Sequence, residues 1–175
     1  MIYINQHSSP QYGPRTKHNA DQGVTVAFAV DHTTAGERLT QKYAAHKIVK
    51  ITPEQFAANP VKCKMAIATK MAICKTNVLN IAGNGIYTWE KHGYDQYYVN
   101  ETLQKILEGV HALQPIEKIV SGGQTGTDLA GLIVGAKMGI PSYGMWPKGY
   151  KMRFADGVDV YLKPQEIMEI INSYA

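Results

Sequence analysis

The segment 121–128, Ser-Gly-Gly-Gln-Thr-Gly-Thr-Asp, has residue types and spacing that suit the binding of an anion. Its glycines allow positive φ angles and let a ligand approach the main chain without a clash against Cβ. The apolar run at residues 129–138 predicts a helix, whose free N–H groups and positive dipole end favour a phosphate. The predicted phosphate- and nucleotide-binding residues of this loop are Gly122, Gly123, Gln124, Thr125, Gly126, Thr127 and Asp128.

This loop matches neither of two common phosphate-binding motifs. It lacks the Gly-x-Gly-x-x-Gly spacing, and no Gly-Lys-Ser/Thr follows its glycines. The alternative interpretation is a tight turn between a strand and a helix that binds nothing. We favour a ligand, because each glycine loses much conformational entropy on folding and a plain turn does not need three of them.

Three further loops are expected at the same edge of the sheet, since ligands of open α/β sheets bind beyond the carboxyl ends of the strands. Two of them follow apolar runs, and the third, at 147–153, supplies cations. Each also has a plainer interpretation: a helix cap, an Asn-Gly turn or solvated charges. The predicted binding residues of these loops are Asp31, Thr33, Thr34, Gly83, Asn84, Gly85, Lys148 and Arg153.

Short β-rich runs alternate with helical patterns along the whole chain, which is typical of an α/β sheet. We expect a single Rossmann-like, doubly wound and mostly parallel domain over residues 1–175, with loops at 8–23 and 86–94. Thr34 and Glu37 have the spacing of a helix capping box. The expected strands are 2–5, 24–30, 47–51, 78–82, 118–121, 142–146 and 160–162. The expected helices are 31–45, 59–76, 95–113, 129–138 and one from Pro164.

Composition excludes several classes of protein. The formal net charge of +4 is dispersed, which is weak for a nucleic-acid binder. The chain has no signal peptide and no apolar run long enough for a membrane span, so we expect a cytoplasmic protein. Cys63 and Cys74 are predicted to be buried free thiols on one helix. The histidines and cysteines lack metal-ligand spacing, and we expect neither a metal nor a cofactor.

Segment 121–128, followed by Gly139-Ile-Pro141 and Pro147-Lys-Gly149, resembles the molybdenum-cofactor carrier family. That family belongs to the Rossmann-like SLOG superfamily, which includes the Lonely Guy phosphoribohydrolases. The resemblance covers about residues 117–160, within a nucleotide-binding half at about 78–175. It implies a nucleotide ligand, a homodimer or larger homo-oligomer, and a bacterial host cell. Residues 26–37 and 80–88 are similar to small phage and plasmid proteins that share this half.

The sequence departs from these families at two positions, and the first departure favours capture of a ligand over its turnover. The glutamate of the phosphoribohydrolase motif falls at Ala130, and Leu129 stands where the carrier family has arginine. We therefore expect a phage- or prophage-encoded protein that sequesters a nucleotide signal, such as a cyclic ADP-ribose derivative, as an anti-defence sponge. The alternatives are a nucleotide N-glycosidase (phosphoribohydrolase) that uses Asp128 or Asp31, and a molybdenum-cofactor carrier.

Overall fold

Six parallel strands form the central sheet, in the order β1-β6-β5-β4-β2-β3. The structure is a computed structural model that describes residues 1–175. The chain reverses its direction of travel across the sheet between β2 and β4, as in doubly wound folds. The strands are β1 (Ile2–Gln6), β2 (Val24–Phe28), β3 (Ile48–Ile51), β4 (Val78–Gly83), β5 (Lys118–Ser121) and β6 (Ser142–Trp146).

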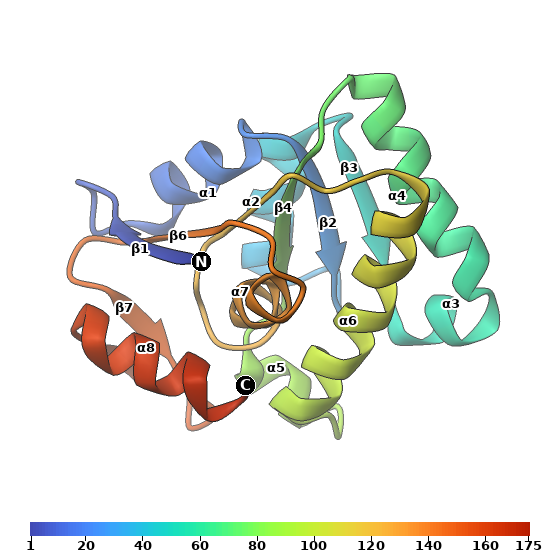
Figure 1. Cartoon of the computed structure of the whole chain (residues 1–175). Helices are drawn as coiled ribbons and strands as arrows, with labels where there is room; N and C mark the ends of the chain where they lie inside the picture. Colours follow the sequence, from blue (N-terminus) through green and yellow to red (C-terminus); the bar gives the residue numbers. More distant parts are fainter.

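Helices cover both faces of this sheet, which confirms the predicted Rossmann-like α/β class (Figure 1). Right-handed crossovers place α1 and α2 on one face and α4, α6 and α7 on the other. The helices are α1 (Tyr12–Ala20), α2 (Ala35–Ala44), α3 (Pro53–Ala58), α4 (Pro60–Cys74), α5 (Ile86–Lys91), α6 (Gln96–Leu113), α7 (Thr127–Lys137) and α8 (Pro164–Ser173).

The main hydrophobic core lies under α4, α6 and α7 and involves one face of the neighbouring strands β2 and β4. Side chains alternate across a strand, so every second residue of β2 and β4 points to this core. The five that do so are large and apolar and are fully buried: Val24, Val26, Phe28, Leu79 and Ile81. The residues between them face α1 and α2 and are small or polar: Thr25, Ala27, Asn80 and Ala82.

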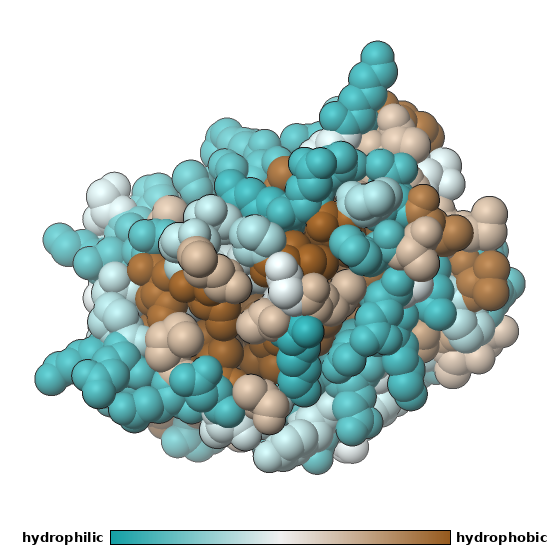
Figure 2. Space-filling model, in the orientation of Figure 1, coloured by the Kyte–Doolittle hydropathy of each residue, from teal (hydrophilic) through white to brown (hydrophobic).

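A smaller core joins α7 and α8 to the edge of the sheet. It consists of seven buried residues, including Trp146 of β6 and Ile167 of α8. Figure 2 shows apolar side chains on this side of the molecule, beside the N-terminus and between α7 and α8. Ile2 and Ile4 of the edge strand are partly buried against the same core. None of the helices combines the length and the apolar composition that crossing a membrane requires.

Residues 8–23 were predicted to form a loop, and this prediction is wrong, because α1 occupies most of them. Pro14 is the third residue of α1, where a missing N–H is tolerated since the first four N–H groups have no partner within the helix. The buried face of α1 is polar: Arg15, Thr16 and Asn19 lie on it beside Ala20. A helix with such a face shows no apolar periodicity.

Three other elements differ from the predictions. Residues 86–94 contain the short helix α5, and α3 precedes the predicted helix that begins near Pro60. Residues 151–153 form a strand, β7, which pairs with β8 (Asp159–Tyr161) in an antiparallel hairpin outside the main sheet. The fold thus has eight strands and eight helices instead of seven and five.

Helix starts and thiols largely follow the predictions. The Thr34 side chain accepts a hydrogen bond from the Glu37 N–H at 3.3 Å and caps α2, although the reciprocal bond of a full capping box is absent. Asp95 caps α6 in the same way, through the Tyr98 N–H at 2.8 Å. Both cysteines are free, but only Cys63 is buried, while Cys74 is half-buried at the end of α4.

Candidate functional site

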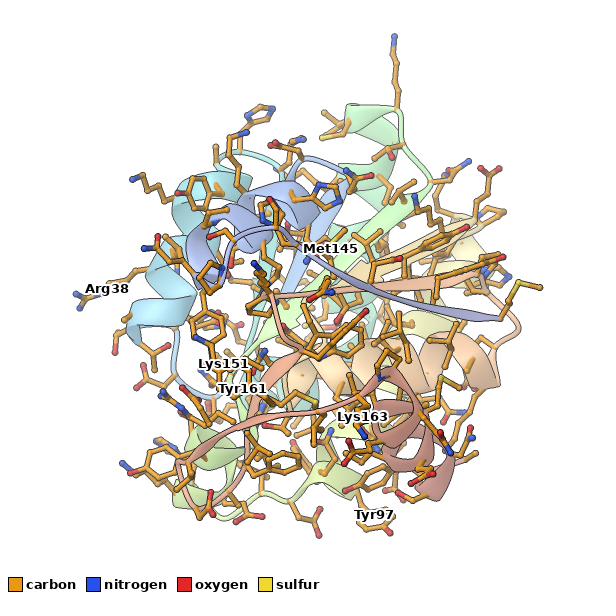
Figure 3. All side chains as sticks on the ribbon, turned by 90° about the vertical axis from the view of Figure 1, so that its left-hand side faces the viewer. Arg38, Tyr97, Met145, Lys151, Tyr161 and Lys163 are labelled. Atoms are coloured by element: carbon orange, nitrogen blue, oxygen red, sulfur yellow. The ribbon has the colours of Figure 1, made fainter.

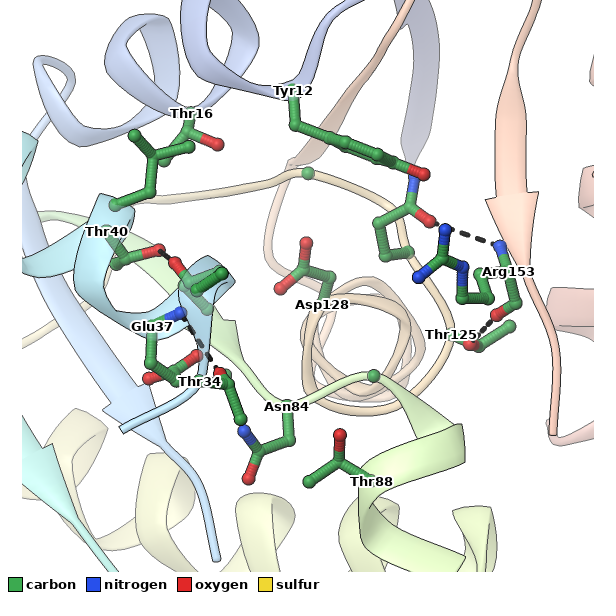
Figure 4. A pocket seen from close by; sticks show the side chains of 18 of the residues that line it. Tyr12, Thr16, Thr34, Glu37, Thr40, Asn84, Thr88, Thr125, Asp128 and Arg153 are labelled. Carbon is green, nitrogen blue, oxygen red and sulfur yellow. Dashed lines mark hydrogen bonds between the residues drawn. The ribbon is translucent and has the colours of Figure 1, made fainter. Parts of the chain in front are cut away.

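A pocket of about 600 Å³ lies at the carboxyl ends of β2, β4 and β5 and extends inward between the sheet and helices α1 and α2 (Figure 4). It exists because the facing side chains of β4 are small or polar, as at Asn80 and Ala82. The polar and charged residues along its wall include Tyr12, Arg15, Thr16, Asn19, Thr34, Glu37, Thr40, Asn80, Asn84, Thr88, Gln124, Thr125, Asp128 and Arg153.

The glycine-rich loop is held in place by hydrogen bonds to neighbouring elements. Gln96 of α6 donates to the Gly126 carbonyl at 2.9 Å and accepts from the Gly126 N–H at 2.8 Å. Gly126 has φ +87°, and a Cβ there would overlap the Asn84 carbonyl, so glycine is required. The Thr127 hydroxyl donates to the Phe28 carbonyl at 2.7 Å and accepts from the Trp89 indole at 3.1 Å.

The same loop is joined to the hairpin β7–β8. The Gln124 side chain donates to the Lys151 carbonyl at 2.6 Å and accepts from the Arg153 N–H at 3.3 Å, and the Thr125 hydroxyl donates to the Arg153 carbonyl. A glutamine amide can bridge two backbone groups in this way because it carries a donor and an acceptor. The hairpin is thereby fixed as one wall of the pocket mouth.

Asp128 places a buried carboxylate on the pocket wall at the start of α7. Its Oδ2 lies 3.4 Å from Arg15 Nη1 of α1, and both side chains are almost fully shielded from solvent. Burial raises the pKa of the Asp128 carboxyl to about 7, although Arg15 lowers it; the nearby Glu37 raises it further. Arginine stays protonated at neutral pH, so Asp128 is the member of this pair that titrates near pH 7.

Glu37 is a second buried carboxylate on the pocket wall, contributed by the first turn of α2. It is 2% exposed, and its Oε2 lies 3.3 Å from Nδ1 of His32 without the geometry of a hydrogen bond. Nε2 of His32 lies 3.3 Å from the Ile51 carbonyl. The pocket therefore contains two carboxylates on facing elements, α2 and α7, with the Arg15 guanidinium beside one of them.

The Asn84 side chain joins the ends of β2 and β4. Its Oδ1 accepts hydrogen bonds from the N–H groups of Val30 and Asp31 at 2.8 and 3.0 Å, and its Nδ2 donates to the Asp31 carbonyl at 2.9 Å. The amide lines the pocket, but most of its capacity is used for these bonds. Asp31 accepts from both the N–H and the hydroxyl of Thr33, which lowers the pKa of the Asp31 carboxyl.

Aromatic and basic side chains surround the pocket mouth. The Lys151 ammonium lies 4.3 Å from the ring centroid of Tyr12, and Lys151 pairs with Tyr161 across the hairpin (Figure 3). Arg153 forms an ion pair with Asp159 at 2.9 Å and is half-exposed. The hairpin thus brings two cations, Lys151 and Arg153, to the mouth, although Arg153 is paired with Asp159, and the carboxylates of Glu37 and Asp128 lie further inside.

The structure brings together residues from all four predicted loops but excludes part of three of them. The predicted residues that line the pocket are Thr34, Gly83, Asn84, Gly85, Gly122, Gln124, Thr125, Asp128 and Arg153. Six predicted residues do not line it: Asp31, Thr33, Gly123, Gly126, Thr127 and Lys148. Gly123 packs against the Trp146 ring, Lys148 is exposed to solvent, and the other four contribute to loop geometry.

Sequence reasoning missed the contribution of α1, α2, α5 and the inner part of β4. The residues concerned are Tyr12, Arg15, Thr16, Asn19, Glu37, Thr40, Asn80, Tyr87 and Thr88. One signal was available for Asn80, since an asparagine in the middle of the apolar run 78–82 requires a polar surrounding. Glu37 was recognised only as part of a capping box.

No family model matches the chain, and no curated protein or solved structure matches it. The resemblance to the molybdenum-cofactor carrier family and the SLOG superfamily stays a prediction that rests on motifs at 121–128, 139–141 and 147–149.

Proposed function

We propose that this chain binds a nucleotide derivative in the pocket between α1, α2 and the glycine-rich loop. One observation carries the proposal. Six buried side-chain polar atoms lack a hydrogen-bond partner, and four of them belong to pocket-lining residues: Arg15 Nε, Asn19 Nδ2, Asn80 Oδ1 and Glu37 Oε2, the last of which has an ion-pair contact with His32 Nδ1 at 3.3 Å. Such atoms are rare in folded proteins and cost about 1–3 kcal/mol each. A ligand with many donors and acceptors would supply their partners.

The charges along the pocket suit the phosphate and sugar parts of a nucleotide. The phosphates would lie at the mouth, near Arg153. The ribose would lie further in, where the carboxylates of Glu37 and Asp128 accept hydrogen bonds from sugar hydroxyls, as acidic residues do in other nucleotide sites. A volume of about 600 Å³ is within the usual range for a ligand of this size.

The proposed role is capture of a phosphate-containing signal, such as a cyclic ADP-ribose derivative, by a phage- or prophage-encoded protein. This role follows from the absence of the phosphoribohydrolase glutamate at Ala130 and from the chain's resemblance to phage proteins. We also propose that the protein forms a homo-oligomer. The test is calorimetric titration with a panel of mono-, di- and cyclic nucleotides, followed by denaturation and chromatography of the released ligand. Recovery of intact ligand supports capture, and the absence of any binding contradicts the proposal.

Cleavage of an N-glycosidic bond is a second candidate, which the properties of Asp128 favour. A carboxyl with a pKa of about 7 is partly protonated at neutral pH and can donate a proton to a departing base. Glu37 on the facing wall would then accept a proton from the attacking water. Release of free base by the wild type, and its loss in Asp128→Asn and Glu37→Gln variants that still bind the nucleotide, would establish this activity. Intact ligand after prolonged incubation would exclude it for the nucleotides tested.

A further inference from the structure

We infer that the inner end of the pocket recognises the base of the bound nucleotide, and that this base carries an amino group beside a ring nitrogen, as adenine does. The inference rests on the proposed function and specifies its ligand. The feature that carries it is a recess between α1, α2 and β4, lined by the uncharged polar side chains of Thr16, Asn19, Thr40 and Asn80.

Two amide groups in this recess are incompletely bonded. The Asn80 amide donates to the Thr25 hydroxyl at 3.0 Å, which leaves its Oδ1 without a partner. The Nδ2 of Asn19 also has no partner. Both residues are 3% exposed, so bulk water does not replace the missing bonds. The recess therefore contains one free donor and one free acceptor, which small rotations of the two amides would turn toward a ligand.

The position of the recess argues against phosphate and for a neutral ring. Tyr12 lies at the mouth, and Asn19 is seven residues further along α1, which is about 10 Å deeper at the helical rise. Glu37 and Asp128 place carboxyl groups on the pocket walls, and the Arg15 guanidinium, one helical turn before Asn19, is paired with Asp128. A phosphate inside the recess would be repelled by the Glu37 carboxylate, whereas an uncharged base would not be repelled.

The free groups match one edge of adenine. The adenine amino group would donate to Asn80 Oδ1, and the adjacent ring nitrogen would accept from Asn19 Nδ2. Asparagine commonly pairs with adenine through these two positions. The last torsion of an asparagine side chain has a broad energy minimum, so small rotations can align both amides with the ring. The small side chain of Ala82 leaves space beside the edge.

Calorimetric titration of the full chain tests the inference with three probes: adenosine 5′-monophosphate, purine riboside 5′-monophosphate, which differs only in lacking the amino group, and ribose 5-phosphate. We expect the adenosine compound to bind about tenfold more tightly than the purine compound, and ribose 5-phosphate to bind most weakly. In the Asn80→Ala variant the two nucleotides should bind equally. In the Asn19→Ala variant both should weaken by a similar factor. Asn172→Ala, at an exposed position on α8, should behave as the wild type.

The outcomes separate this inference from the function on which it rests. If none of the three probes binds the wild type, the proposed function fails along with the inference. If the nucleotides bind but ribose 5-phosphate binds as tightly, the base is not recognised and only the inference is overturned. The inference alone is also overturned if the wild type does not prefer adenosine 5′-monophosphate to purine riboside 5′-monophosphate. It is likewise overturned if that preference survives in the Asn80→Ala variant. Affinity ratios are compared within one variant, so a loss of stability does not mimic the expected result.

Discussion

The two faces of the neighbouring strands β2 and β4 carry side chains of different polarity. One face packs valine, leucine, isoleucine and phenylalanine side chains into the core under α4, α6 and α7. The other face carries Thr25, Ala27, Asn80 and Ala82 and borders a pocket with unpartnered polar atoms. Parallel strands buried on both faces are usually apolar on both. The departure on the α1–α2 side marks the face that borders the proposed ligand site.

The largest contrast is expected between Ile81 and its neighbour Asn80, which point to opposite faces. Ile81→Ala removes fully buried apolar volume and should lower the free energy of unfolding by about 2–5 kcal/mol. Asn80→Ala loses one hydrogen bond but also removes an unpartnered buried acceptor, so its net effect should stay within about 1 kcal/mol. Urea denaturation measures both. Equal losses would contradict the proposed division between the faces.

Gly122→Ala should damage the pocket more than the fold. A Cβ at this position would overlap the Arg15 guanidinium and approach Asp128 Oδ2, so the ion pair must shift. We expect a stability loss of about 1–3 kcal/mol and a decrease in nucleotide affinity of about tenfold or more. Gly36→Ala is the matched control, because Gly36 also lines the pocket but has no atom within 4 Å of its Cβ position. Unchanged affinity in Gly122→Ala would show that the Arg15–Asp128 pair does not shape the site.

The pH dependence of stability tests the burial of Asp128. Its pKa is raised to about 7 in the folded chain, above the value of about 3.9 for an unfolded aspartate. Between these values the unfolded chain is ionised while the folded chain holds the proton. The contribution of this group to stability therefore falls as pH rises from about 4 to about 7, by at most about 1.4 kcal/mol per pH unit. Asp128→Asn should lack this decline. Parallel curves for variant and wild type would contradict the assignment.

The smallest effects are expected at the mouth. Arg153→Ala should weaken nucleotide binding a few-fold at low salt, since this half-exposed cation lines the mouth and its field is screened by salt. Lys148→Ala should leave affinity unchanged, because its exposed side chain lies outside the pocket. Titrations at two salt concentrations distinguish the two variants. A stronger effect at Lys148 would place the phosphates elsewhere.

The sequence predicts the sheet well, because the alternation of apolar runs and turn residues follows directly from burial of the strands. It also predicts the glycine-rich loop at 121–128. The glycines that reveal this loop include Gly126, whose positive φ other residues rarely adopt. Helix α1 escapes prediction because its buried face is polar and Pro14 resembles a helix breaker. Both features follow from α1 lining a pocket instead of a core. Residues such as Glu37 and Asn19 become recognisable only when the elements that bring them to Asp128 are assembled.

Native mass spectrometry of the protein purified from cells that make nucleotide signals tests the central claim most directly. We expect a bound species with the mass of an intact nucleotide derivative, which dissociates unchanged on heating and is less populated in the Gly122→Ala variant. A protein that carries no ligand, and that also gains none when nucleotides are added, would contradict it.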